Sequence, residues 1–206
     1  MSSFRTSNFF LSVFWAMRGG GAGSWGVIID TTLRTFPIFN ATLHTVNVLT
    51  DTLDQTANLM TTHAMHVKDW DAVRAGQYFY LSGSALNSTL VVSTLFKDLD
   101  GNASKAQMSP FLNDARALGA VVENESTITA VANDIVGFAD DASGFNLILS
   151  SRLIPASVYL DSPGDVGAAY HQILSQGIPQ ILGHLVAGGV FSSPIFFFLL
   201  CSICHD

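Results

Sequence analysis

The sequence is short of cysteine and of basic residues, and each shortage excludes a class of protein. Its 206 residues include two cysteines, Cys201 and Cys204, both within the last six positions. The main body therefore has no disulfide framework. Nine Lys and Arg residues stand against sixteen Asp and Glu residues, for a formal net charge of −7. Without a basic run the chain lacks the clustered cations that a nucleic-acid surface needs.

A membrane span is also missing. The hydrophobic C-terminal stretch "SSPIFFFLL" is too short to cross a bilayer and is interrupted by Pro194. Hydrophobic residues nevertheless make up 49% of the chain, which is ample for a buried core. The length suits one domain or a piece of a larger protein.

The N-terminus has the apolar length of a signal peptide, since Arg5 precedes the run "NFFLSVFWAM". That run continues directly into "RGGGAG", which favours a chain that starts inside a domain over a true signal peptide. Four N-x-Ser/Thr sequons indicate a secreted parent and predict glycosylation. Their asparagines are Asn40, Asn87, Asn102 and Asn124.

The glycine-rich stretch "GAGSWG" at residues 21–26 fits the dinucleotide-binding pattern G-x-G-x-x-G. That pattern requires a helix directly after the glycines and an acidic residue about twenty positions on. Residues 27–36 are instead rich in β-branched side chains with period two, which predicts a strand. A Walker A motif is excluded because no Gly-Lys-Ser/Thr follows. The glycines therefore predict a turn that leads into a strand, either purely structural or packed against a ligand.

The longer run "FWAMRGGGAGSWGVIIDTTLRTFP" resembles the "LFWALRGGGGGxFGVV" segment of FAD-linked oxidases of the vanillyl-alcohol-oxidase superfamily. Within it, the run is most similar to the berberine-bridge-enzyme-like branch, with its PCMH-type FAD-binding domain, in the secreted fungal form. The resemblance continues through "RLIPASVY" and "ILGHLVAGG", so that it covers roughly residues 13–189.

This resemblance implies three regions in the chain. Residues 1–37 would end the FAD-binding domain, and residues 38–189 would form an incomplete substrate domain. The family pattern stops at Val190, so residues 190–206 are expected to be an aberrant hydrophobic tail outside the core.

The resemblance also implies FAD as the cofactor and a small organic substrate that passes a hydride to the flavin, with oxygen as acceptor. The backbone at Gly23, Ser24, Gly26 and Ile28 would contact FAD. The domain that holds FAD in the family is missing here, so the chain as given is predicted to be inactive. No residue matches a family catalytic base, and none is assigned. The alternative, from another class, is a non-enzymatic α+β binding or interaction domain.

The rest of the sequence predicts strands and helices in mixed order. Amphipathic or alternating patterns predict strands at 40–50, 77–81, 88–96 and 179–189 and a helix at 52–67. Ser109-Pro110 and Ser162-Pro163 are each expected to open a further helix, with the serine as N-cap. The predicted fold is α+β, a mainly antiparallel sheet layered by helices. The resemblance implies that the open face of this sheet covers the flavin ring.

Two apparent ligand motifs fail on inspection. "DLDGN" at 98–102 begins like a calcium loop, but Ala103 and Ser109 occupy the positions that need Gly and Glu. Cys201-Ser-Ile-Cys204-His205 has the c-type haem spacing, but only Asp206 follows it to build a pocket. We expect no metal site.

Five other side chains are candidates with an ordinary structural alternative. His63 and His66 lie three apart on the predicted helix, and a solvated helix face is favoured over a metal pair. Tyr78 and Tyr80 share one face of a strand, where core packing is favoured over a substrate pocket. His184 is interpreted as a core or pocket-lining histidine.

Overall fold

The computed structural model describes residues 32, 35, 37–83, 86–135, 147–177, 180–185 and 197–204, and only the backbone of 147–153, 180–185 and 197–204. The chain divides into two compact units, Met1–Pro37 and Ile38–Asp206. Nearly all described residues belong to the second unit, which is the subject below. The strand predicted at residues 27–36 lies outside the described residues, apart from isolated positions.

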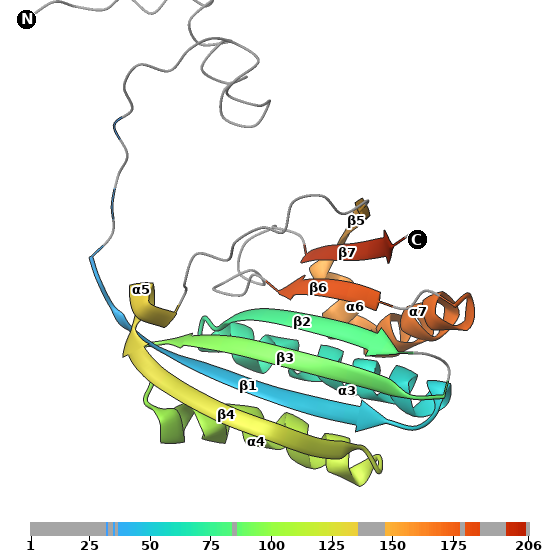
Figure 1. The fold of residues 1–206 in the computed structure, drawn as a ribbon, viewed down its shortest axis with the longest axis horizontal. Helices are drawn as coiled ribbons and strands as arrows, with labels where there is room; N and C mark the ends of the chain where they lie inside the picture. Colours follow the sequence, from blue (N-terminus) through green and yellow to red (C-terminus); the bar gives the residue numbers. More distant parts are fainter. Residues whose placement is uncertain are drawn as a thin grey trace, which may run out of the picture. The chain divides into compact units, whose positions relative to one another are not determined.

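The second unit is built on a seven-stranded sheet with the strand order β4-β1-β3-β2-β6-β7-β5 (Figure 1). Every neighbouring pair is antiparallel. This confirms the predicted α+β fold with a mainly antiparallel sheet. The strands are β1 Asn40–Thr50, β2 Gly76–Gly83, β3 Ser88–Lys97, β4 Val121–Val131, β5 Leu147–Ile154, β6 Gln180–Leu185 and β7 Phe197–Cys204.

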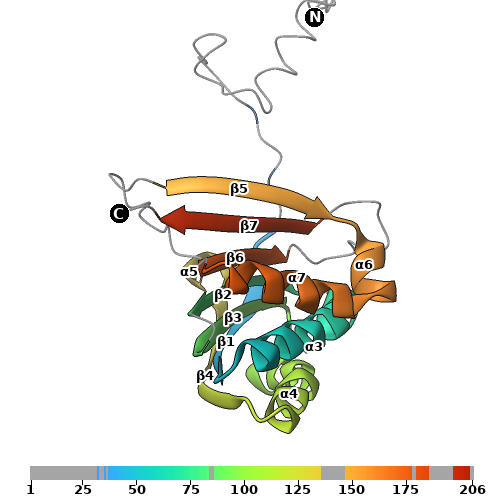
Figure 2. The same ribbon diagram turned by 90° about the vertical axis from the view of Figure 1, so that its right-hand side faces the viewer.

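Among the described residues, helices cover one face of this sheet and none covers the other, which we call the open face (Figure 2). Successive side chains of a strand point to opposite faces, so one covered face produces alternating burial. Strand β3 alternates between buried and partly exposed residues from Ser88 to Phe96. In β2, Gln77, Phe79 and Leu81 are buried, and the tyrosines between them are exposed. The hydrophobic core therefore lies between the sheet and the helices.

Helix α3, Leu53–Ala72, is the central helix of the covering layer. Its first turn is closed reciprocally: the Thr52 hydroxyl accepts a hydrogen bond from the Gln55 amide at 3.1 Å, and Gln55 Oε1 accepts from the Asp51 amide at 2.7 Å. Its buried face includes Leu59 and Trp70. The amphipathic helix predicted from residue 52 is confirmed and extends five residues beyond the predicted end.

Helix α4, Gly101–Ala117, begins earlier than predicted. Its N-cap is Asp100, whose side chain accepts a hydrogen bond from the Ala103 amide at 2.8 Å. Ser109-Pro110 lies inside the helix, so the helix start predicted there is wrong. The residue before the helix already satisfies an amide of the first turn, and Met108 and Phe111 bury one continuous face. The "DLDGN" turn is therefore a helix cap.

Helix α7, Pro163–Ser175, begins at the predicted proline. The Ser162 side chain, however, makes no capping hydrogen bond. Gly167 of α7 lies directly against Ala57 and Thr61 of α3, where a Cβ would collide with both residues. Two short helices complete the described set, α5 Ala132–Ile135 and α6 Ala156–Asp161.

The C-terminal segment contributes one more strand to the sheet. Residues 197–204 form β7, which pairs with β6 on one side and β5 on the other. This part of residues 190–206 therefore joins the sheet through its backbone, and its packing against the core stays a prediction. Backbone pairing places it in the sheet, because an apolar run next to an open strand can supply a ladder of hydrogen bonds whatever its origin.

Candidate functional site

The open face of the sheet presents two tyrosines side by side on β2. Tyr78 and Tyr80 are 53% and 38% exposed, whereas their neighbour Phe79 is buried under the helices. The preferred interpretation, core packing of the two tyrosines, is therefore wrong. Both rings lie on the face that the helices do not cover.

The strand register places polar and apolar residues beside these rings. Tyr78 pairs with Ser93, which pairs in turn with Thr45, and their hydroxyls are 3.5 Å apart. Tyr80 pairs with Val91, which pairs with Asn47. Aromatic rings with polar tips beside hydroxyl and amide groups form a surface suited to a planar, partly polar ligand or to another domain. We call these six residues the open-face cluster.

Cations are scarce on this face. The Lys and Arg side chains that the structure describes are Lys68, Arg74, Lys97, Lys105 and Arg116. Of these, Lys97 ends the β3 row that belongs to the open face, and its Nζ lies 4.0 Å from Asp98 and 5.2 Å from the centre of the Phe39 ring. Within the described residues, the open-face cluster is therefore suited to packing against the planar ring of a ligand. It lacks the cations that bind a diphosphate.

A buried polar chain holds β2 from the covered side. His63 Nε2 of α3 lies 2.7 Å from Gln77 Oε1, and Gln77 Nε2 donates to Thr94 Oγ1 at 2.8 Å. The His63 ring also packs against Trp70, Phe79 and Phe111. Burial lowers the pKa of His63 to about 4. The hydrogen bond to Gln77 acts in the opposite direction and raises this pKa, whereas the nearby His66 lowers it further.

The solvated helix face predicted for His63 is therefore wrong. His66 behaves differently, because its Nε2 lies 2.8 Å from Asp114 Oδ2 of α4 and its Nδ1 lies 3.5 Å from Asp69. The two histidines do not share a ligand. In the described part of the chain, no three His, Cys, Asp or Glu residues are arranged to hold a metal ion.

Sequence reasoning missed a second buried histidine. His44 is fully buried in β1, and its Nε2 lies 3.1 Å from Glu125 Oε1 of β4. Its position had a signal, because His44 is in phase with Val46 and Val48 on the covered face of the strand. The pair ties the edge strand β4 to its only described neighbour.

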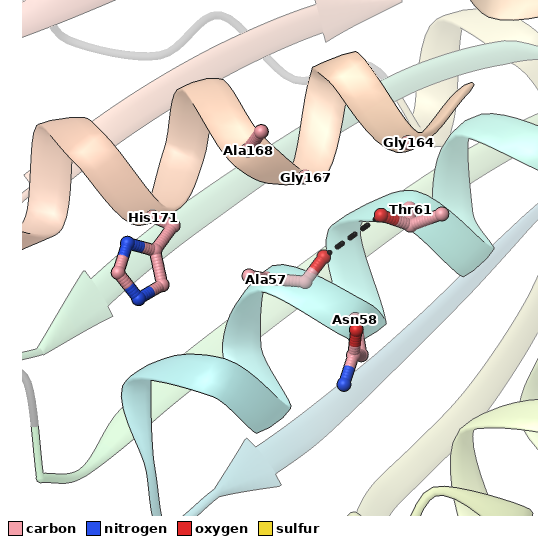
Figure 3. Close-up of a pocket in the computed structure, with 7 residues that line it drawn as sticks. All are labelled: Ala57, Asn58, Thr61, Gly164, Gly167, Ala168 and His171. Atoms are coloured by element: carbon pink, nitrogen blue, oxygen red, sulfur yellow. Dashed lines mark hydrogen bonds between the residues drawn. The ribbon is translucent and has the colours of Figure 1, made fainter. Parts of the chain in front are cut away.

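A hollow of about 490 Å³ lies between α3 and α7, on the helical side of the sheet (Figure 3). Inside it the Thr61 hydroxyl donates to the Ala57 carbonyl at 3.1 Å, and His171 Nε2 lies 3.2 Å from Asp54 Oδ1 nearby. It is lined by Ala57, Asn58, Thr61, Gly164, Gly167, Ala168 and His171. Small residues at a close helix crossing account for this hollow, and we assign it no ligand.

The remaining predicted residues have mixed outcomes. Gly23, Ser24, Gly26 and Ile28 lie outside the described residues, as does His205. For His184 the backbone alone is described, and it pairs with Tyr78 across β6 and β2. All four sequon asparagines, Asn40, Asn87, Asn102 and Asn124, are exposed. No helix among the described residues is long and apolar enough to cross a membrane.

Comparison with known proteins identifies relatives that use flavin. The chain is 28% identical over 205 residues to an uncharacterized FAD-linked oxidoreductase of Arthroderma benhamiae, covering 86% of this chain and 33% of that protein. It is 60% identical over 25 residues to the flavin-dependent oxygenase ucdF of Aspergillus ustus, covering 12% of this chain and 5% of that protein. No family model matches the chain.

Solved structures give the same answer for the fold. The VAO-type flavoprotein MtVAO615 of Myceliophthora thermophila C1 superposes with a TM-score of 0.68 at 15% identity, covering 94% of this chain and 38% of that one. A variant of berberine bridge enzyme superposes with a TM-score of 0.60 at 15% identity, covering 94% of this chain and 42% of that one. The chain thus spans about a third of its curated relative. The predicted sequence resemblance to an FAD-linked oxidoreductase is confirmed, and the fold is similar to those of a VAO-type flavoprotein and berberine bridge enzyme.

Proposed function

We propose that this chain is a fragment of a secreted FAD-dependent oxidoreductase, that residues 38–189 are its incomplete substrate domain, and that the open sheet face of this domain covers the flavin ring. The observation that carries the proposal is the exposed Tyr78–Tyr80 pair on the uncovered face of an antiparallel sheet. A face with large aromatic side chains and no covering helices is suited to packing against another domain or ligand.

In the active protein FAD would accept a hydride from a small organic substrate and return the electrons to oxygen, since such chemistry belongs to the cofactor. The described residues would orient the substrate and shield the flavin ring from water. Tyr78 and Tyr80 would exclude water from one side of the flavin ring. The Ser93 and Thr45 hydroxyls would offer hydrogen bonds to a polar edge of the substrate. We assign no catalytic base.

We further propose that residues 1–206 alone neither retain FAD nor oxidise a substrate. A dinucleotide needs many preorganised polar contacts, and the open-face cluster offers no cation for the diphosphate. The glycine turn that contains Gly23, Ser24, Gly26 and Ile28 would add only a few backbone groups.

A desalting experiment tests this division of labour. Residues 1–206 are incubated with FAD, desalted and scanned for flavin absorbance, beside the same chain extended upstream to the length of its curated relative. We expect a flavin band only in the extended protein. A band near stoichiometric occupancy in residues 1–206 would show that the fragment binds the cofactor by itself. No band in either protein would favour the non-enzymatic binding domain.

A second measurement tests the open face directly. In the extended protein, the double variant Tyr78→Ala/Tyr80→Ala is expected to make the flavin more accessible to a soluble fluorescence quencher. Met65→Ala, which truncates an exposed side chain of α3 in the helical layer, is the matched control. Equal quenching in both variants would place the flavin away from the open face.

A further inference from the structure

Strand β4 forms one edge of the sheet. It is the first strand in the order, and among the described residues only β1 pairs with it. With eleven residues it is a long edge. Unpaired backbone groups on a long edge strand can pair with the same strand of another molecule, and proteins usually guard such edges with charge, proline or bulges.

The charged residues that protect β4 from such pairing are confined to one half of the strand. Its two charged residues, Glu123 and Glu125, lie in the first half of the strand. The second half, residues 126–131, reads "STITAV" and contains no charge, no proline and no glycine. Ile128 in this half is 58% exposed. A six-residue segment of this composition on an exposed edge is prone to intermolecular β-pairing.

A β-bulge lies directly before this unguarded half. The register with β1 shifts between Thr45 and Asn47, so that Asn124 and Glu125 both stand opposite Val46. Asn124 has a φ of 52°, a conformation that asparagine tolerates better than most residues. Its exposed side chain lies in the sequon Asn124-Glu125-Ser126, and Ser126 is exposed as well.

The other sequons differ in their hydroxyl residue. Thr42 and Ser104, which complete the sequons of Asn40 and Asn102, are fully buried. Thr89, which completes the Asn87 sequon, is partly buried in β3. Asn124 therefore belongs to the one sequon in which both the asparagine and the hydroxyl residue are exposed, and it is the one on the sheet edge.

We propose that Asn124 carries an N-linked glycan that covers the β4 edge and keeps residues 126–131 from pairing with a second copy of the chain. This rests on the secretory route that is part of the proposed function. In the transfer, Asn124 Nδ2 forms a bond to C1 of the sugar and loses one proton. The bond between C1 and the diphosphate of a lipid-linked oligosaccharide donor breaks, and the lipid diphosphate leaves.

Three substitutions at Ser126 separate the glycan from the backbone geometry, since Asn124 stays in its bulge in all of them. Ser126→Thr keeps the sequon, and Ser126→Ala removes it. Ser126→Lys also removes it but places a charge on the edge. The full 206-residue chain and the three variants are directed into the secretory pathway of a eukaryotic host. Glycopeptide mass spectrometry then gives occupancy, and light scattering over a concentration series gives self-association.

We expect Asn124 to be occupied in the wild type and in Ser126→Thr. Ser126→Ala should be unoccupied and should self-associate at a roughly tenfold lower protein concentration. Ser126→Lys should also be unoccupied but should resist association, because lysine guards an edge. An unoccupied Asn124 beside an occupied Asn87 overturns the site without touching the secretory route. Equal association of Ser126→Ala and Ser126→Thr, or of Ser126→Ala and Ser126→Lys, overturns the protective role.

Discussion

His63 Nε2 of helix α3 lies 2.7 Å from Gln77 Oε1 of strand β2 in the buried layer of the domain. Gln77 is the residue before Tyr78, and the two point to opposite faces of the sheet because strand side chains alternate. One hydrogen bond beneath the sheet therefore helps to fix the strand that presents the open-face tyrosines.

The buried neutral state of His63 makes the domain sensitive to acid. Burial lowers its pKa from 6.5 to about 4, so the unfolded chain takes up the proton at a higher pH than the folded one. The free energy of unfolding is therefore highest above pH 6.5. It falls as the pH is lowered from 6.5 to about 4, by about 3 kcal/mol in total. Urea denaturation of the wild type and of His63→Gln across this window measures it. Parallel curves for the two proteins would show that His63 does not titrate in this way.

Two residues at helix N-caps, Asp100 and Ser162, should differ in how much they stabilise the domain. Asp100→Ala should destabilise the domain by about 1 kcal/mol, because the Asp100 carboxylate accepts the Ala103 amide. Ser162→Ala should change the free energy of unfolding very little, because that side chain makes no capping bond. Thermal denaturation of both variants checks the contrast. Equal losses would mean that Ser162 also caps its helix.

Gly167 should be the more sensitive of two glycines in α7. Gly167→Ala would push a methyl group into Ala57 and Thr61, at a cost of roughly 1–3 kcal/mol. Gly164→Ala is the matched control, because nothing lies within 4 Å of a Cβ at that position. Chemical denaturation of each variant measures the difference. A neutral Gly167→Ala would show that α3 and α7 can separate without loss.

Neighbouring residues of β2 should differ in their effect on stability. Phe79→Ala should cost about 3–5 kcal/mol, because that ring is buried against His63 and Tyr170. Tyr78→Ala should cost no more than about 1 kcal/mol in residues 1–206, because half of the residue is exposed. Urea denaturation compares the two. A large loss for Tyr78→Ala would mean that the open face is part of the core of this unit.

Sequence predicted the elements whose signal is local. Strand β1, the β2–β3 hairpin, helix α3 and the start of α7 follow from alternation, amphipathic spacing and proline chemistry. It did not predict β4, because a strand at the sheet edge with one open face is polar over much of its length. It misplaced the start of α4, because Asp100 and Ser109 are both acceptable N-caps and only packing selects between them.

The candidate site depended on the tertiary structure. Alternation in "GQYFYL" fixes that Tyr78 and Tyr80 share one face and Phe79 the other, and it does not say which face the helices cover. Helices α3 and α7 settle that by packing on the side of Phe79. Phe111 of α4 then helps to enclose His63, whose helical spacing alone suggested solvent. Residue order and side-chain chemistry thus determined the strands and helices that have a local signal, and the two faces of each. Burial of apolar surface between layers decided which face became core and which stayed open, because that free energy depends on contacts between segments far apart in the chain.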